Sequence, residues 1–195
     1  ELASYFFTVL LVLIIHFFLT YGSLLFLLTK VRLVYFYSKM KNAILFAFST
    51  ASSAATIPVT LKTVEEELKV EKSVASFSVP LGATINMDGT AIMQGVATIF
   101  IANAYGINLE ISDFISVIMV ATLASIGTAG VPGVGLIMLA MVLNQVGLPS
   151  EGIALIIGID RLLDMTRTAV NVTGDAAISC VVASSEKKIN YNYKE

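Results

Sequence analysis

The chain has 195 residues, of which 56% are hydrophobic and only 13% are charged, and its mean hydropathy is +0.85. A soluble domain carries about 25% charged residues, so this composition indicates an integral membrane protein. The formal net charge of −2 and the lack of a basic run argue against a nucleic-acid-binding protein. The one cysteine, Cys180, excludes a disulfide framework. The one histidine, His16, has no histidine or cysteine partner with which to hold a metal ion.

Five apolar segments follow one another, and three of them are much longer than the roughly 20 residues of a single membrane span. The first predicts one transmembrane helix over residues 1–30. The second predicts a link and a re-entrant hairpin, hairpin 1, over 31–72, interrupted by Ser-Ser-Ala-Ala-Thr-Ile-Pro at 52–58. The third predicts a broken helix over 73–104, interrupted by Asn-Met-Asp-Gly-Thr at 86–90.

The second half of the chain repeats this order. A run of Gly-Thr-Ala-Gly-Val-Pro-Gly at 127–133 splits the fourth segment and predicts a second re-entrant hairpin, hairpin 2, over 105–148. The fifth segment predicts a long helix over 149–185, with a polar break, Asn-Val-Thr-Gly-Asp, at 171–175 and a polar tail over 186–195. Non-helical backbone at membrane depth needs protein or water to satisfy its N–H and C=O groups, so the breaks predict a cavity.

The distribution of positive charge orients these segments. Ten of the twelve lysines and arginines lie within 30–41, 62–72 and 187–194, whereas the connections at 110–113 and 144–151 have none. Positive loops favour the cytoplasmic side, so we expect hairpin 1 to enter from the cytoplasm, hairpin 2 from outside, and the tail to be cytoplasmic. The result is an all-α, multi-pass inverted repeat of a hairpin and a discontinuous helix, which is typical of secondary transporters. A channel, whose selectivity filter can also be a re-entrant loop, is an alternative, although a filter needs no charged ladder on a neighbouring helix.

The fifth segment carries a ladder of polar residues inside an otherwise apolar sequence. At 100° per residue of an α-helix, the members of the ladder share one stripe. Ionisable groups at membrane depth usually face a substrate or ion path. The ladder consists of Asp160, Asp164, Arg167, Thr168, Asn171 and Asp175.

Asp164 and Arg167 are the best candidates to bind a substrate. A carboxylate in a dry site suits an ammonium group, and the planar guanidinium suits bidentate binding of a carboxylate. The alternative is a structural ion pair between the two. We expect Asp160 and Arg161, nearer the outer end of the helix, to serve helix packing or surface pairing.

Neighbouring segments supply further hydrogen-bonding groups. Ser52 and Ser53 begin the second half of hairpin 1, where free N–H groups at a helix start can receive a carboxylate. Helix capping is the alternative role of these serines. The remaining predicted substrate contacts are Thr90, Gly130, Val131, Thr168 and Asn171.

Four motifs, in this order over about residues 40–185, resemble those of the glutamate transporter family, the dicarboxylate/amino acid:cation symporters. They are the interruption at 52–58, the interruption at 86–90, the glycine-rich run at 127–133 and the polar ladder. The segment 1–30 is similar to the family's sixth transmembrane helix, so the resemblance implies most of the mobile transport domain without the trimerisation scaffold. It also implies a homotrimer in the cell membrane, in the plasma or inner membrane, with hairpin 2 as the extracellular gate. Family members that carry neutral amino acids tend to lack the arginine, and carriers of simple dicarboxylates tend to lack the aspartate. The presence of Asp164 and Arg167 together therefore implies L-aspartate or L-glutamate as the substrate.

The resemblance also implies coupling ions, with sodium favoured and protons as the alternative, and no other cofactor. An enzyme is not expected. An intramembrane aspartyl protease is the remote alternative, but no aspartate here follows the Gly-x-Gly pattern of those enzymes. The family's sodium ligands correspond in this chain to Gly82, Thr84, Asn86, Asp88, Ser125, Ile126, Thr128, Asn171 and Asp175.

Overall fold

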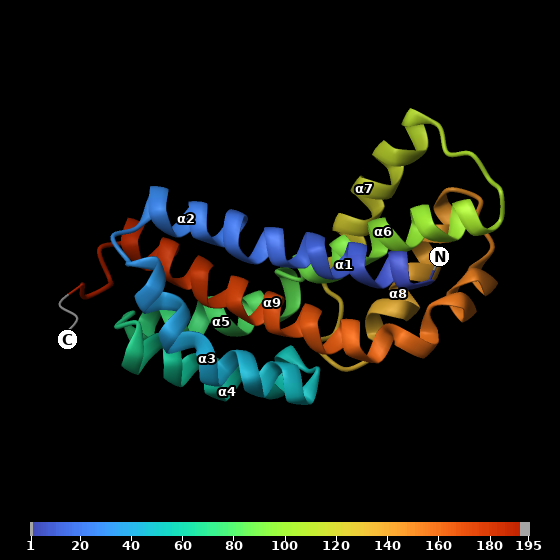
Figure 1. Cartoon of the computed structure of the whole chain (residues 1–195). Helices are drawn as coiled ribbons and strands as arrows, with labels where there is room; N and C mark the ends of the chain where they lie inside the picture. Colours follow the sequence, from blue (N-terminus) through green and yellow to red (C-terminus); the bar gives the residue numbers. More distant parts are fainter. Residues whose placement is uncertain (1, 192–195) are drawn as a thin grey trace.

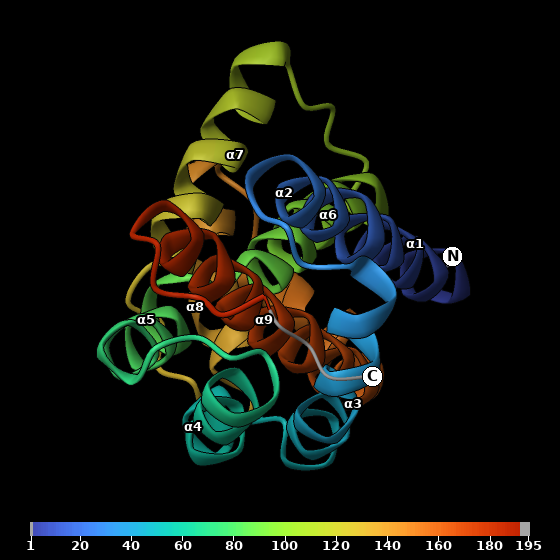
Figure 2. The ribbon, with the colours of Figure 1, turned by 90° about the vertical axis from the view of Figure 1, so that its left-hand side faces the viewer.

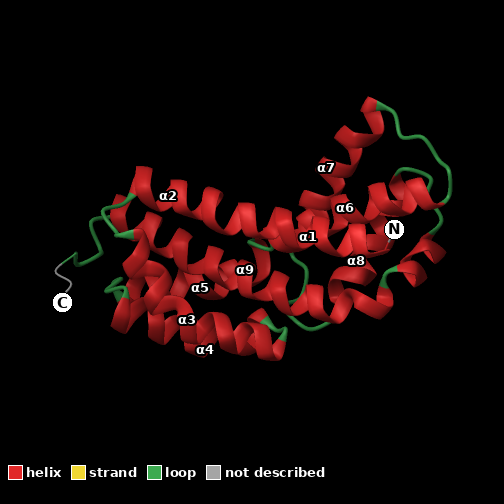
Figure 3. Cartoon of the chain, in the orientation of Figure 1, coloured by secondary structure: helices red, strands yellow, loops and turns green. Residues whose placement is uncertain are grey.

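A computed structural model describes residues 2–191, and within them the chain is helical with short connections (Figures 1 and 3). The first rod combines α1 (Leu2–Ile15), a π-helical turn (His16–Thr20) and α2 (Tyr21–Leu28). Of the described helices, this rod alone is long and apolar enough to cross a membrane by itself. The π-helical turn is a local widening of the kind that often marks a functional site.

Hairpin 1 consists of α3 (Leu33–Thr50) and α4 (Ser53–Lys62), and α4 continues into a π-helical turn, Thr63–Glu67. The chain reverses at Ala51, whose φ of 50° is left-handed. Ser52 then caps α4, because its hydroxyl oxygen accepts a hydrogen bond of 3.1 Å from the backbone N–H three residues further on.

The next helix is interrupted where the sequence reads Asn-Met-Asp-Gly-Thr. α5 (Lys72–Ile85) ends there and α6 (Asp88–Ala104) begins, with Asn86 and Met87 between them in neither helix. Hairpin 2 follows as α7 (Ile111–Ser125) and α8 (Val134–Gln145), joined by a loop that contains the glycine-rich run.

The last helix, α9 (Ile157–Ser185), follows a short 3-10 helix, Ser150–Leu155, and runs through the centre of the bundle (Figures 1 and 2). It packs against every helix from α1 to α6, and all residues from 167 to 177 are buried. Hairpin 2 is set apart, since neither α7 nor α8 packs along α9 among the described helices, and α7 projects from the bundle.

The predicted break at 171–175 is wrong, because α9 is continuous through it. The polar side chains do not compete with the helix: Thr173, for example, donates its hydroxyl to the Ala169 carbonyl one turn back, at 2.8 Å. Gly174 does not break α9; it allows neighbouring segments to pack closely against the helix. A Cβ there would lie 2.5 Å from the Tyr21 hydroxyl and 2.8 Å from Asn86 Nδ2.

The end of hairpin 1 and the end of α9, both rich in charged residues, meet at one end of the molecule. The Glu71 N–H donates to the Lys188 carbonyl at 2.8 Å, and Val70 forms a single β-bridge with Ile189. Residues 192–195 of the predicted tail lie outside the described residues.

Large apolar side chains cover much of the outer surface. This pattern is the reverse of a soluble protein and suits contact with lipid or with further helices. The most exposed include Phe7, Phe26, Leu27, Val34, Ile111 and Ile118.

Candidate substrate and ion site

The tips of the two hairpins meet. The Gly130 carbonyl accepts hydrogen bonds from the Ser52 hydroxyl at 2.6 Å and from the Ala54 N–H at 3.1 Å. The Gly127 N–H donates to the Thr84 carbonyl at the end of α5, at 2.8 Å. A Cβ on Gly130 would lie 2.9 Å from the Ala54 nitrogen, so only glycine allows this approach.

Arg167 is fully buried in α9 and is held by two carboxylates, a group that we call the arginine clasp (Arg167, Asp160 and Asp164). Its Nη1 donates to Asp160 Oδ1 at 2.7 Å, and its Nη2 donates to Asp160 Oδ2 at 3.3 Å and to Asp164 Oδ1 at 3.0 Å. The other oxygen of Asp164 accepts the Gly133 N–H from hairpin 2, at 3.0 Å. One carboxylate therefore links the clasp to hairpin 2.

Neutral groups from α6 and α9 lie beside the clasp. Asn171 accepts the Gly89 N–H at 2.8 Å and donates to the Thr90 hydroxyl at 3.4 Å. The Thr168 hydroxyl donates to the Asp164 carbonyl within α9, at 2.8 Å. These side chains are buried, so each can exchange its present partner only for another polar group.

A small cavity of about 20 Å³ lies between the hairpin tips and α9. This volume holds about one water molecule, so an amino acid could enter only if the tips moved apart. Seven predicted substrate residues line it: Ser53, Thr90, Gly130, Val131, Asp164, Thr168 and Asn171. Ser52 and Arg167 do not line it, because Ser52 is bonded to the opposite tip and Arg167 lies inside the clasp.

Asp175 lies two turns further along α9 than Thr168, beside the break between α5 and α6. Its Oδ1 accepts a hydrogen bond of 3.1 Å from the Asn86 amide. The carboxylate also rests against the α5 backbone, since a Cβ on Gly82 would lie 2.5 Å from the same oxygen. Asp175 is 2% exposed and has no cationic partner among the described residues.

Asp88 makes contacts that the sequence did not indicate. His16 Nε2 lies 2.6 Å from Asp88 Oδ2, and the Tyr21 hydroxyl donates to the same carboxylate at 2.7 Å. His16 begins the π-helical turn and Tyr21 follows it, so that irregularity brings both side chains toward the broken helix.

The other predicted ion ligands lie in or near the hairpin 2 loop. The Thr84 carbonyl is bonded to Gly127 and the Ser125 carbonyl to the Thr128 N–H, while Ile126 is half-exposed. No three His, Cys, Asp or Glu side chains converge on one point within the described part of the chain. A cation site in this region would therefore combine one or two carboxylates with carbonyl and amide oxygens.

Two features of this site escaped the sequence analysis. Asp160, expected to serve packing or surface pairing, is 3% exposed and is the main partner of Arg167, whereas Arg161 is exposed. The difference in burial between the two residues follows from the helical period, because Asp160 is on the ladder stripe and Arg161 points 100° away from it. The second feature is the His16–Asp88 contact, which joins residues 72 positions apart and has no signal in local sequence.

Two helical hairpins that meet over buried charges, next to an interrupted helix, match the class of secondary transporters whose sites lie between repeats at discontinuous helices. The chain belongs to the sodium:dicarboxylate symporter family, whose profile matches residues 1–185. Membership of a symporter family argues against the alternative of an intramembrane aspartyl protease.

The chain is similar to named transporters of animals. It is 44% identical to mouse excitatory amino acid transporter 3 over 96% of its length and 36% of that protein. It is 47% identical to a putative sodium-dependent excitatory amino acid transporter, glt-3, of Caenorhabditis elegans over 90% of its length and 33% of that protein. It is 44% identical to human excitatory amino acid transporter 2 over 90% of its length and 31% of that protein. The chain thus spans about a third of the length of these relatives.

Proposed function

We propose that the protein carrying this chain is a secondary active transporter that moves L-aspartate or L-glutamate across the cell membrane together with sodium ions. The names of the similar proteins, excitatory amino acid transporters, support the substrate class, and the family description supports sodium. The arginine clasp is the main support for the proposal. Asp164 lines the cavity and suits a substrate ammonium, and Arg167 is bonded to Asp164 and suits a substrate carboxylate.

Substrate binding is an exchange of partners at the clasp. The substrate ammonium replaces the Gly133 N–H at Asp164, and the side-chain carboxylate takes an Nη position of Arg167 now held by an aspartate. The α-carboxylate binds the start of α4 at Ser52 and Ser53, where it replaces the Gly130 carbonyl as the acceptor of the Ser52 hydroxyl and the Ala54 N–H. The remaining contacts are Thr90, Gly130, Val131, Thr168 and Asn171.

The buried charges supply a reason for cation coupling. Asp160, Asp164 and Asp175 against Arg167 leave a net charge of −2 among the buried groups of α9 if all are ionised, and each is at most 9% exposed. An acidic amino acid adds one more negative charge, and buried negative charge is costly unless cations offset it. Sodium ions suit the oxygen groups present, and we assign them to Gly82, Thr84, Asn86, Asp88, Ser125, Ile126, Thr128, Asn171 and Asp175. Protons on the carboxylates are the alternative coupling ions.

Hairpin 2 is the gate in this proposal. Its helices α7 and α8 do not pack along α9, whereas α3 and α4 of hairpin 1 do. Four tip hydrogen bonds hold it closed: two at Gly130, one at Gly127 and one at Gly133. Gly127 and Gly133, each with φ of 81°, are suited to act as hinges.

The charge distribution and the family resemblance support two further parts of the proposal. The basic segments support a cytoplasmic position for the end of α9 and the tail, and an outer position for hairpin 2. The whole protein is a homotrimer in the plasma or inner membrane.

Uptake of radiolabelled L-aspartate into proteoliposomes that hold the whole protein tests the function. An imposed inward sodium gradient should drive uptake and an imposed proton gradient should not. Uptake with protons alone would keep the substrate and reassign the carboxylates as proton carriers. If neither gradient drives uptake, the proposal fails and the clasp is a structural group of ion pairs.

A further inference from the structure

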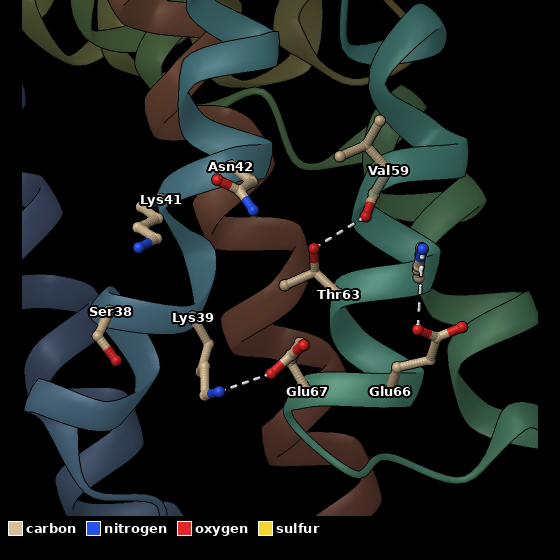
Figure 4. A pocket seen from close by; sticks show the side chains of 9 residues that line it. Ser38, Lys39, Lys41, Asn42, Val59, Thr63, Glu66 and Glu67 are labelled. Atoms are coloured by element: carbon tan, nitrogen blue, oxygen red, sulfur yellow. Dashed lines mark hydrogen bonds and ion pairs between the residues drawn. The ribbon is translucent and has the colours of Figure 1, made fainter.

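Arg167 has more anionic partners than its single charge requires. Elsewhere in the described chain a cation pairs with one carboxylate: beside the cavity of about 420 Å³ between α3 and the end of α4, Lys39 binds Glu67 at 2.7 Å (Figure 4). Arg167 instead binds two carboxylates, those of Asp160 and Asp164, and all three groups are buried. Each buried carboxylate costs free energy, so the second one on this guanidinium requires an explanation.

The two carboxylates bind different edges of the planar guanidinium. Asp160 accepts from both terminal nitrogens, from Nη1 at 2.7 Å and from Nη2 at 3.3 Å, so it occupies the end of the fork. Asp164 accepts from Nη2 alone, at 3.0 Å. The side edge of a guanidinium is formed by Nη2 and Nε, whose N–H groups are parallel and suit a second carboxylate. Asp164 therefore holds one half of the side edge.

The other half of the side edge is unused. Arg167 Nε is buried and has no hydrogen-bond partner among the described residues, and a buried N–H group without a partner is costly. The Nη2 atom lies beside the substrate cavity: a Cβ on Gly135 would be 3.4 Å from it and 3.4 Å from Thr90 Cγ2, and Gly135 and Thr90 both line the cavity. A carboxylate that arrives from the cavity can therefore take Nη2 and Nε together.

The two aspartates differ in the partners that they have besides Arg167. Asp164 lines the cavity, and its second oxygen accepts the Gly133 N–H, so it can also receive a substrate ammonium. Asp160 does not line the cavity, and its carboxylate hydrogen-bonds only to Arg167 within the described part of the chain. Release of Asp160 would leave a buried and unpaired carboxylate, which is strongly destabilising.

We propose that Asp160 is a positioning residue for substrate selection, which keeps the end of the Arg167 fork both with and without substrate. The side edge then exchanges Asp164 for the side-chain carboxylate of an acidic amino acid, and Asp164 passes to the substrate ammonium. Every charge stays paired in this exchange. Without Asp160, the guanidinium would turn wholly to Asp164 and hold the carboxylate that the substrate needs. This inference rests on the proposed function.

The test is equilibrium binding of radiolabelled L-aspartate to the purified whole protein in sodium, with Asp160→Asn as the variant. A loss of affinity of roughly tenfold or more is expected, because Arg167 then pairs more tightly with Asp164. Tighter binding is the result expected if Asp160 instead competes with the substrate for Arg167, and either tighter or unchanged binding would overturn the proposal. Glu151→Gln, which removes an exposed carboxylate, is the matched control and should change the affinity by less than about twofold.

A double variant separates positioning from a general structural role. Arg167→Gln should weaken aspartate binding by itself, and R167Q/D160N should bind within about twofold of it, since Asp160 acts through the guanidinium. A further loss in R167Q/D160N would assign Asp160 to the support of the fold and would contradict the proposal. Melting temperatures of all variants report on folding, and the comparison of R167Q with R167Q/D160N still decides if Asp160→Asn alone does not fold. A wild-type protein that binds no L-aspartate would refute the proposed function and this inference with it, whereas wild-type affinity in Asp160→Asn would refute this inference alone.

Discussion

The closed contact between the hairpin tips can be tested by one methyl group. Gly130→Ala would place a Cβ 2.9 Å from the Ala54 nitrogen, 3.1 Å from the Ala83 carbonyl oxygen and 3.2 Å from Ser53 Cβ. The nearest of these atoms belong to the backbone and cannot turn away as a flexible side chain can. The φ of Gly130 is not left-handed, so alanine is strained only when the tips are together.

The size of the effect follows from the contacts that are lost. The Gly130 carbonyl accepts two hydrogen bonds from hairpin 1, each worth about 1 kcal/mol. Overpacking of the closed tip adds about 1–3 kcal/mol. The closed state should therefore lose about 3–5 kcal/mol relative to the open state, a shift of roughly 100-fold or more in their ratio.

The assay is the distance between spin labels on cysteines at Ala55 and Leu123, both exposed, measured by pulsed electron paramagnetic resonance in the whole protein. Gly130→Ala should lengthen the distance and slow aspartate uptake. Gly95→Ala is the matched control, because a Cβ there meets nothing within 4 Å. Wild-type distances and uptake in Gly130→Ala would refute the reasoning, as would an equal change in Gly95→Ala.

Four further outcomes are expected. Asp164→Asn should abolish binding of L-aspartate in an equilibrium binding assay, and wild-type affinity would contradict its role with the substrate ammonium. Arg167→Cys should shift competition for uptake toward neutral amino acids, whereas unchanged aspartate selectivity would count against the clasp. Asp175→Asn should raise the sodium concentration for half-maximal uptake by roughly tenfold or more, since it removes a buried charge; an unchanged value would remove Asp175 from the ion site. The Lys39–Glu67 pair lowers the pKa of Glu67 below 4.5 and raises that of Lys39 above 10.5, so its stabilisation should hold at neutral pH. It should fade as pH falls through the folded-state pKa of Glu67 or rises through that of Lys39, measured as the melting temperature difference from K39Q/E67Q; a difference that does not change with pH would contradict the pair.

The sequence predicted the parts of this fold that depend on local backbone chemistry. Glycine, proline and serine mark where hairpins reverse and where α4 starts, and the helical period places the ladder on one stripe. The error at 171–175 has the same origin, because an Asn and a Gly in one short run also suit a break. Gly174 is required by the approach of Tyr21, a contact between helices that no local pattern contains.

Local sequence patterns did not predict which side chains of the site contact one another, for a different reason. Asp160 and Arg167 are seven residues apart on one stripe, but two turns of helix separate their backbones. Whether a long side chain spans that distance depends on the packing around it. His16 and Asp88 are placed together only when the first rod lies along α6 and α9.

The position of the arginine clasp and Asp175 on one central helix has a consequence for how the molecule can move. Asp160, Asp164, Arg167 and Asp175 keep fixed distances because α9 is continuous and its neighbours α1 to α6 pack against it. A change that admits substrate must then come from an element that touches the site without packing along that helix. Hairpin 2 meets this condition: it reaches the clasp through one hydrogen bond, from Gly133 to Asp164. In the proposed transporter, a substrate ammonium that binds this carboxylate would therefore act at the point where hairpin 2 and the charged ladder meet, so that one residue would both bind the substrate and contact the closed hairpin.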